Sequence, residues 1–371
     1  MTLSGLPGLA DLPGLRMGLI GPLPPPSGGM ANQTRQLVAL LTAAGATVTT
    51  VQVNAPYRPS WAGRVPVLRS VFRLAPYLAA LWRAAGHTDI FHIIANSGWS
   101  WHLFAAPAVW VARSRGVAVV VNYRGGEAEE FLQRSGRLVR LTMRRASALV
   151  VPSAFLQGVF SRFGMQADIV PNIIDLSHFR PRDPVRQGVP HLVVARNLEP
   201  LYDNETAIRA FKIIRANFPQ VRLTIAGSGP DEQRLRQFVL DQGLVDVVHF
   251  TGRLERDAMA ALYRSADIML NPSLADNMPN SVLEAWASGV PVVSTNVGGI
   301  PYLAQHGVTA SLVPSADPVA MAKACVTLLS SEALWQQRAL AGLQEAQRYT
   351  WPRVQPVLVD VYRRAMQKPT H

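Results

Sequence analysis

Short apolar runs rich in β-branched residues alternate along this chain with longer stretches of helical periodicity. The first five runs predict strands at 16–20, 47–53, 89–94, 117–123 and 148–151. A second series of runs predicts strands at 191–196, 221–227, 247–252, 266–273 and 290–295. Strands that alternate with helices are typical of βαβ units, and therefore of parallel sheets.

A proline-rich passage at 171–190, PNIIDLSHFRPRDPVRQGVP, separates the two series. Such a density of turn residues favours an interdomain linker. A chain of 371 residues is also too long for one ordinary α/β core. We therefore predict two doubly wound α/β domains, an N-terminal one at 1–178 and a C-terminal one at 188–350.

The cysteine count and the apolar runs bear on the cellular compartment. The one cysteine, Cys325, excludes a disulfide framework and fits a reducing compartment. The N-terminus has no charged region ahead of an apolar core, so we expect no signal peptide. The longest apolar runs, 99–112 and the arginine-interrupted 65–82, fall short of the ~18 to 20 clean apolar residues that a spanning helix needs. We expect a soluble or peripheral protein.

A formal charge of +12 implies an anionic partner. Nucleic acid is not expected, because the basic residues are scattered and no zinc knuckle, RNP-like segment or basic recognition helix is present. Phosphorylated sugars and an acidic membrane face would each explain the charge. The densest basic segment places five arginines within an arc of about 140° on a helix. They form either a solvated face or a lipid-facing patch, and they are Arg134, Arg137, Arg140, Arg144 and Arg145.

In doubly wound folds ligands bind at the carboxyl ends of the strands. After the first predicted strand, Gly28 and Gly29 open a helix that begins near Met30. Backbone N–H groups without side chains in the way can approach an anion closely there. The G-x-G-x-x-G spacing and the Walker P-loop are both absent, so a dehydrogenase or a P-loop ATPase fits poorly.

The stretch DNMPNSVLEAWASG combines a helix start with two carboxylates. Ser281 and Glu284 form S-x-x-E, which predicts a capping box, and Gly289 is the expected helix stop. A helix N-terminus binds anions, and a carboxylate one turn in can accept hydrogen bonds from a vicinal diol. A diphosphate beside a ribose has both features. Asp276, in a loop that prolines 272 and 279 stiffen, could hold the hydroxyls of the group that the diphosphate carries.

The segment 273–299, SLADNMPNSVLEAWASGVPVVSTNVGG, resembles the signature of the family-4 (group 1) glycosyltransferases, in which seven residues separate two acidic ones. The resemblance extends to the N-terminal glycine pair and to the segments 226–235, 250–273 and 306–322. It implies the α/β GT-B fold, with two Rossmann-like doubly wound domains facing across a cleft. It also implies a nucleotide-sugar donor, retention of anomeric configuration, and a C-terminal helix at 351–371 that completes the first domain.

The resemblance further implies roles for individual residues. Glu284 would bind the ribose, Asp276 the donor sugar, and backbone N–H groups around Ser281 and Val282 the phosphates. The neighbouring donor-binding positions are Asn277 and Met278, and Gly28 and Gly29 would touch the diphosphate from the first domain.

Arg196 matches the arginine that stabilises the leaving diphosphate in this family, although a solvated strand end is its other reading. The family's lysine position holds Tyr202, which could donate one hydrogen bond without a charge, and Asp203 stands near a common glycine. No D-x-D metal site is present, so we expect neither a metal nor another cofactor.

The acceptor side is less defined. Arg124 lies near the position of a histidine in many relatives, and could stabilise the leaving group, bind an anionic acceptor, or pair with Glu127 or Glu129. His92 is expected to be structural, and Glu127 is an outside candidate for a base.

These observations predict a retaining glycosyltransferase that moves a sugar from a UDP- or GDP-sugar to a glycan or lipid-linked acceptor, in polysaccharide or glycoconjugate biosynthesis. It would act in the cytosol or peripherally on the inner face of the membrane. Two alternatives stay open at this point. A sugar-nucleotide epimerase could share the fold, and the missing lysine would suit a non-catalytic sugar-nucleotide-binding subunit.

Overall fold

The structure is a computed structural model that describes residues 12–25, 28–55, 66–181 and 188–367. The chain forms two compact units, one of residues 1–171 with 352–371, and one of residues 172–351. Residues 172–178, which the sequence assigned to the N-terminal domain, therefore belong to the second unit. The N-terminal residues 1–11, for which we expect no signal peptide, lie outside the described residues.

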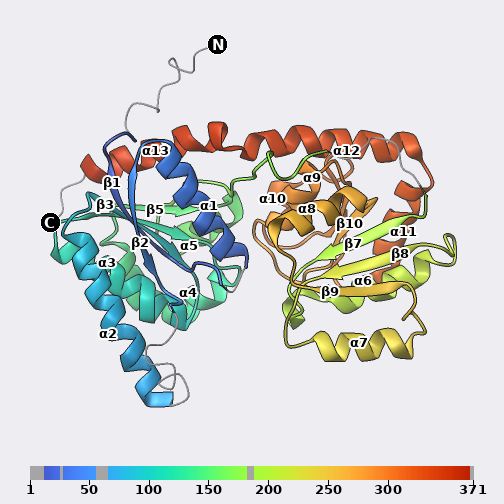
Figure 1. Ribbon diagram of the computed structural model, residues 1–371, viewed down its shortest axis with the longest axis horizontal. Coiled ribbons are helices and arrows are strands. Elements are labelled where there is room, and N and C mark those ends of the chain that lie inside the picture. The colour runs from blue at the N-terminus through green and yellow to red at the C-terminus, as the bar shows by residue number, and fades with distance from the viewer. Residues whose placement is uncertain (1–11, 26–27, 56–65, 182–187, 368–371) are drawn as a thin grey trace, which may run out of the picture. The chain divides into compact units, whose positions relative to one another are not determined.

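The first unit is a six-stranded parallel sheet flanked by helices (Figure 1). Its strands lie in the order β2-β1-β3-β4-β5-β6. They are β1 Arg16–Gly21, β2 Thr47–Gln52, β3 Ile90–Ala95, β4 Ala118–Tyr123, β5 Ala148–Val151 and β6 Asp168–Ile169. The helices are α1 Gly29–Ala43, α2 Pro66–Ala85, the π-helical turn η2 Trp101–Ala105, α3 Ala106–Ser114, α4 Ala128–Met143, α5 Ala154–Arg162 and α13 Trp351–Gln367.

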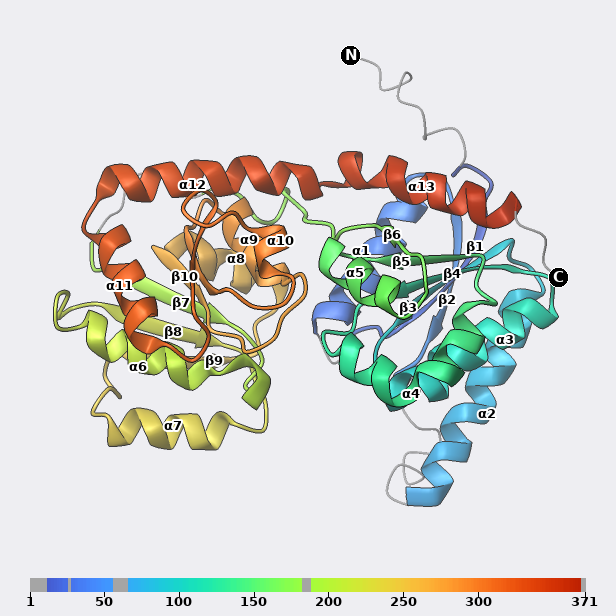
Figure 2. The same cartoon turned by 180° about the vertical axis from the view of Figure 1, so that it is seen from behind.

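Alternate side chains of these strands pack on opposite faces of the first sheet. Phe91 and Ile93 of β3 join one core with buried residues of α2, α3, α4 and α5. His92, between them, points to the other face and contacts Tyr362 of α13. Figure 2 shows α3, α4 and α5 on the face opposite to α1. Because helices cover both faces of the sheet, the strand sequences are nearly continuous apolar runs.

The second unit has the strand order β12-β11-β10-β7-β8-β9, again all parallel. Its strands are β7 His191–Ala195, β8 Arg222–Ala226, β9 Val248–Gly252, β10 Ile268–Asn271, β11 Val292–Thr295 and β12 Ala310–Val313. Its helices are η3 Pro200–Tyr202, α6 Asn204–Ile214, α7 Glu232–Asp241, α8 Arg256–Ser265, α9 Asn280–Ala287, α10 Ile300–Leu303, α11 Pro318–Leu329, α12 Glu332–Ala346 and η4 Gln347–Tyr349.

The core of the second unit also has two layers. Helices α6, α7 and α11 cover one face of the sheet, and Cys325 lies fully buried in that layer. Helices α8, α9 and α10 cover the other face. All ten predicted strands are present, and β6 and β12 are additional ones. No helix in the described part of the chain is long and apolar enough to cross a membrane.

Candidate donor site in the second unit

The strand order of the second unit reverses between β7 and β10, and doubly wound folds bind ligands at such a switch point. Arg196 follows β7, and its Nε donates a hydrogen bond to Oδ1 of Asn271, the last residue of β10 (2.7 Å). The Asn271 amide is fixed in turn, because its Nδ2 donates to Ser294 Oγ (3.0 Å). Arg196 therefore spans the two strands on either side of the switch point.

The Arg196 guanidinium is nearly buried and still charged. Burial lowers its pKa to about 10, which leaves it protonated at neutral pH. The Tyr202 ring lies beneath it, with the guanidinium carbon 5.1 Å from the ring centroid. Tyr202, in the position where the family has a lysine, thus packs against Arg196 as a cation–π partner. The next residue, Asp203, has a left-handed φ of 39° and accepts a hydrogen bond from Thr206 N at the start of α6.

Asp276 forms an ion pair with Arg196, and both side chains are only about one-tenth exposed (10% and 11%). The Asp276 carboxylate also accepts a hydrogen bond from the Asn277 backbone N–H (2.9 Å). The sequence assigns these residues to different parts of a ligand, and in the structure the two charges neutralise each other. A ligand that offers an anionic group to Arg196 and hydroxyl groups to Asp276 would give each residue a new partner in place of the ion pair.

Glu284 lies one turn into α9 and is half-buried. Burial raises the pKa of its carboxyl group to about 7, although Tyr263, Arg256 and Arg196 favour the ionised form. The Tyr263 hydroxyl donates to Glu284 Oε2 (3.3 Å). The carboxylate is therefore held in place with acceptor capacity to spare, as a vicinal diol requires.

The predicted capping box is wrong. Helix α9 begins at Asn280, its N-cap is Pro279, and no side chain caps it. Ser281 consequently lies inside the first turn, where its Oγ is buried with no hydrogen-bond partner in the described part of the chain. The Val282 N–H donates to the Pro279 carbonyl (3.2 Å), so it is already engaged. The predicted stop is confirmed, because Gly289 follows the helix with φ of 70°.

The other predicted donor residues differ in accessibility. Asn277 and Met278 are buried, and the Met278 carbonyl accepts a hydrogen bond from Asn172 Nδ2 (2.8 Å). A donor would reach these two residues through their backbone.

In the first unit, Gly28 caps α1 in an extended conformation, and nothing lies within 4 Å of where its Cβ would be. The start of α1 is thus open to an incoming anion.

Two glycine pairs lie against the backbone of the site, and the sequence analysis did not assign them a role. A Cβ on Gly298 or Gly299 would overlap the backbone carbonyls of Asp276 and Asn277. Glycines 227 and 229 have the same relation to the carbonyls of Arg196 and Leu198. The glycines of the segments AGSGP and NVGG could have predicted these contacts, because glycine lets two backbone segments approach closely.

Arg124 of the first unit ends a buried chain of hydrogen bonds. Its Nε donates to Asn122 Oδ1 (3.2 Å), and Asn122 Nδ2 donates to His92 Nε2 (3.0 Å). His92 Nδ1 then carries the proton and bonds to the Tyr362 hydroxyl (2.8 Å). Burial lowers the pKa of His92 to about 3, which makes it neutral and structural, as expected. Glu129, one of the expected partners of Arg124, pairs with Arg162 instead (3.0 Å).

Only three of the five clustered arginines, Arg134, Arg137 and Arg140, lie within α4. Helix α4 ends at Met143, so Arg144 is its C-cap and Arg145 lies beyond it, with its guanidinium 5.5 Å from the Trp110 centroid. Arg140 Nε donates back to the Gly136 carbonyl (3.1 Å). Arg134, Arg137 and Arg144 are exposed, and Arg134 pairs with Glu130.

Among the described residues no group of three His, Cys, Asp or Glu side chains could hold a metal ion. Metal-independent chemistry stays a prediction.

Two family models match the chain, one for each unit. "Glycosyl transferases group 1" matches residues 190–331, and "Glycosyl transferase 4-like domain" matches residues 28–172. D-inositol 3-phosphate glycosyltransferase of Paenarthrobacter aurescens is 28% identical over 64% of this chain and 60% of its own length. Phosphatidyl-myo-inositol mannosyltransferase of Mycobacterium leprae is 26% identical over 94% of this chain and 96% of its own. The chain thus spans less than two thirds of the first relative and nearly all of the second.

Solved structures agree on the fold. Sucrose-phosphate synthase of Thermosynechococcus elongatus has a TM-score of 0.73 at 20% identity, covering 94% of this chain and 98% of that one. HepE of Anabaena, in complex with UDP and glucose, has a TM-score of 0.72 at 18% identity, covering 94% and 99%. With both units matched by models of one enzyme family and the paired Rossmann-like sheets in place, this chain belongs to the group 1 glycosyltransferases of GT-B fold.

Proposed function

We propose that this protein transfers a sugar from a nucleotide-diphosphate sugar to a hydroxyl acceptor, with retention of anomeric configuration. The observation that carries the proposal is the meeting of Arg196, Asp276 and Glu284 at the switch point of the second unit. These three groups offer a cation for a diphosphate, a carboxylate for sugar hydroxyls and a carboxylate for a ribose diol. HepE of Anabaena was crystallised with UDP-glucose, which supports testing UDP-sugars first and GDP-sugars second.

In the proposed reaction the bond between the anomeric carbon and the diphosphate oxygen breaks, and the acceptor hydroxyl oxygen bonds to that carbon. The acceptor's proton passes to the departing phosphate oxygen. Arg196, together with the N–H groups at the start of α9, would neutralise the charge that develops on the diphosphate. No metal is part of this proposal, because these cationic and N–H groups supply the charge stabilisation.

Two point variants test the proposal by failing differently. Glu284→Gln should mainly raise the donor KM, because the ribose is unchanged during the reaction. Asp276→Asn should lower kcat by about 100-fold, the scale on which misplacing the reacting carbon costs rate. It should not raise the donor KM, because losing Asp276 also frees Arg196 for the diphosphate.

Transfer would be measured with UDP-glucose and a panel of acceptors, with circular dichroism as the folding check. Asp241→Asn, an exposed position on α7, is the matched control. Product analysis separates transfer from epimerisation, which would leave the sugar on the nucleotide. If Asp276→Asn keeps the wild-type kcat with every donor accepted, Asp276 does not hold the sugar. Donor binding without any transfer or hydrolysis would instead indicate a non-catalytic binding subunit.

The acceptor is proposed to be a glycan or lipid-linked polyol. The names of the matched relatives contain an inositol phosphate and a phosphatidylinositol, which supports a polyol acceptor in glycoconjugate biosynthesis. We propose that the enzyme acts on the cytoplasmic side, in the cytosol or peripherally on the membrane.

The proposed membrane contact is the exposed end of α4 with its C-cap, which presents Arg137, Leu138, Leu141 and Arg144. The two leucines are 67% and 53% exposed, which would let them enter the headgroup layer between the arginines. Each arginine near an anionic surface contributes about 1 kcal/mol, so replacing both by serine should weaken vesicle binding by about 30-fold.

Co-sedimentation with phosphatidylglycerol vesicles at low and high salt would test this. The control replaces two exposed arginines of the second unit, Arg222 and Arg264, by serine. Binding that depends equally on both pairs would reflect net charge rather than a patch on α4.

A further inference from the structure

Asn172 is the first residue of the second unit, and it bonds to the loop between β10 and α9. Its side chain is buried, and Nδ2 donates both to the Met278 carbonyl (2.8 Å) and to Asn280 Oδ1 (2.7 Å). Its backbone N–H contacts Met278 Sδ (3.4 Å). One amide from a segment more than 100 positions away therefore joins the residues on either side of Pro279.

The start of α9 has little support of its own. Its N-cap is Pro279, which has no N–H, and no side chain caps the helix. Met278 is buried, so its carbonyl needs a partner within the protein. Nearby residues of the same chain segment usually satisfy the groups at a helix start. Here Asn172 supplies the bonds from a distant segment.

The segment that carries Asn172 is fixed within the second unit. The Ile174 N–H donates to the Tyr349 carbonyl (2.8 Å), and Ile174 forms an isolated parallel bridge with Thr350. Ile174 and Phe179 are buried in the same core layer as α9. Asn172 therefore holds the loop from an ordered part of the unit.

The loop joins two groups of proposed donor contacts. Asp276, the proposed partner of the donor sugar, lies before Met278, and its carbonyl accepts a hydrogen bond from the Gly299 N–H (2.9 Å). Glu284 and the N–H groups proposed for the nucleotide lie after Asn280, on α9. The bonds from Asn172 lie between these two groups, so they fix how Asp276 is placed relative to α9.

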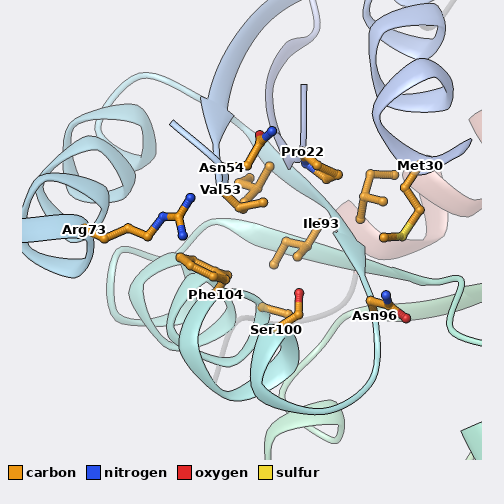
Figure 3. Close-up of a pocket in the computed structure, with 12 residues that line it drawn as sticks. Pro22, Met30, Val53, Asn54, Arg73, Ile93, Asn96, Ser100 and Phe104 are labelled. Carbon is orange, nitrogen blue, oxygen red and sulfur yellow. The ribbon is translucent and has the colours of Figure 1, made fainter. Parts of the chain in front are cut away.

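The first unit contains an asparagine with similar contacts. Asn54, after β2, donates from Nδ2 to the Leu23 carbonyl (2.8 Å), and its Oδ1 accepts from the Leu23 N–H (2.9 Å). Figure 3 shows Asn54 beside Pro22, in a cavity of about 210 Å³ that Arg73 and Phe104 also line. In both units an asparagine amide thus pairs with the backbone of a proline-containing loop that follows a parallel strand.

We propose that Asn172 is a positioning residue for sugar transfer, which keeps Asp276 in place relative to the start of α9. The inference rests on the proposed function and adds a residue that acts through the loop rather than on the donor. Without its bonds, the carboxylate that holds the sugar would shift against the helix that holds the nucleotide.

The test separates the rate of transfer from nucleotide binding. Asn172→Ala should lower kcat for transfer from UDP-glucose by about 10- to 100-fold, because a displacement of about 1 Å can cost about 100-fold in rate. Calorimetric affinity for UDP should stay near the wild-type value, because the proposed UDP contacts lie on Arg196 and α9. If Asn172→Ala does not fold, Asn172→Ser, which keeps one hydroxyl donor, should show the same separation with a smaller loss of kcat.

A double-mutant cycle identifies the residue through which Asn172 acts. Asp276→Asn alone is expected to lower kcat by about 100-fold. The double variant Asn172→Ala/Asp276→Asn should be about as slow as Asp276→Asn, because the carboxylate that Asn172 positions is already gone. Losses that multiply would overturn the inference.

The matched control is Thr224→Val, which removes a buried hydrogen bond between Thr224 Oγ1 and His191 Nε2 (2.8 Å). His191 begins β7, at the opposite end of the strand from Arg196, so this variant should lose stability and keep the wild-type kcat. Two results would refute the role of Asn172 and leave the proposed function intact. One is a wild-type kcat in folded Asn172→Ala, and the other is an equal loss of kcat and UDP affinity.

Hydrogen exchange of residues 276–283, measured by mass spectrometry, makes the result independent of turnover. This segment should exchange faster in Asn172→Ala than in the wild type, and it should not change in Thr224→Val. If the protein transfers nothing but shows this difference, the hold of Asn172 on the loop stands and the proposed function falls. If transfer occurs and exchange in the segment does not depend on Asn172, the proposed function stands and the positioning role falls.

Discussion

The buried carboxyl group of Glu284 should make donor binding depend on pH. Its pKa is raised to about 7 because burial disfavours the charged form. A ribose diol donates hydrogen bonds, so it binds the ionised carboxylate better than the protonated acid. Donor affinity should therefore fall as pH drops below about 7, and Glu284→Gln should abolish that dependence.

The size of the effect follows from the pKa. With a value of about 7, roughly one carboxyl group in thirty is ionised at pH 5.5, so the donor dissociation constant should rise by up to about 30-fold between pH 8 and pH 5.5. The same titration affects folding stability in the direction opposite to donor binding. Because the folded state holds this proton more tightly than the unfolded state, the contribution of Glu284 to stability is fully present below pH 4.5 and is lost as pH rises through 7. That loss is about 3 kcal/mol, since one pKa unit is worth about 1.36 kcal/mol.

The assay is calorimetric titration with UDP-glucose from pH 5.5 to pH 8. Its diphosphate is esterified at both ends and has no proton to lose in this range, so the ligand itself adds no slope. Glu284→Gln keeps the size of the side chain and removes the titration. Wild type and Glu284→Gln should bind UDP-glucose with similar affinity at pH 5.5, and the wild type should bind increasingly more tightly than the variant as pH rises.

Two results would refute this reasoning. Equal pH slopes in wild type and Glu284→Gln would show that another group titrates. A flat wild-type profile with weaker binding by the variant at every pH would show that Glu284 holds the ribose but has an ordinary pKa.

Three further outcomes are expected. Gly299→Ala should raise the donor KM at least about tenfold with little change in circular dichroism, because a Cβ there overlaps a backbone carbonyl of the Asp276 loop. Gly158→Ala, inside α5 with nothing within 4 Å of the new Cβ, should raise the free energy of unfolding by about 0.5–1 kcal/mol in urea titrations. Tyr362→Phe removes one of the two hydrogen-bond partners of His92 and should lower kcat while the donor KM stays constant; an unchanged kcat would show that this chain does not position Arg124.

The sequence located nearly all the strands by itself. Runs such as VAVVVNY are apolar and β-branched because both faces of β4 are buried, and burial of that kind is visible in the residues alone. Strands β6 and β12 were not predicted, because DI is too short to carry a pattern and ASLV has a single β-branched residue, Val313. The resemblance to the glycosyltransferases, later supported by the family matches, also came from local segments.

Local sequence was less decisive about the start of α9. The spacing of Ser281 and Glu284 suits a capping box, but the same spacing occurs within a helix that begins two residues earlier. The structure places the start at Asn280, after Pro279, which turns Ser281 inward and leaves Glu284 beside Tyr263. The carboxyl group's raised pKa comes from that burial, which depends on how α8 and α9 pack together.

Only the tertiary structure decided which distant residues meet. Arg196 and Asn271 lie 75 positions apart, and they touch because β7 pairs with β10 rather than with another strand. Likewise Arg73 and Phe104 face one cavity because β1 lies between β2 and β3. Periodicity records which side chains are buried and what local conformation they favour. The order of parallel strands is set by long-range packing, which no short stretch of sequence encodes.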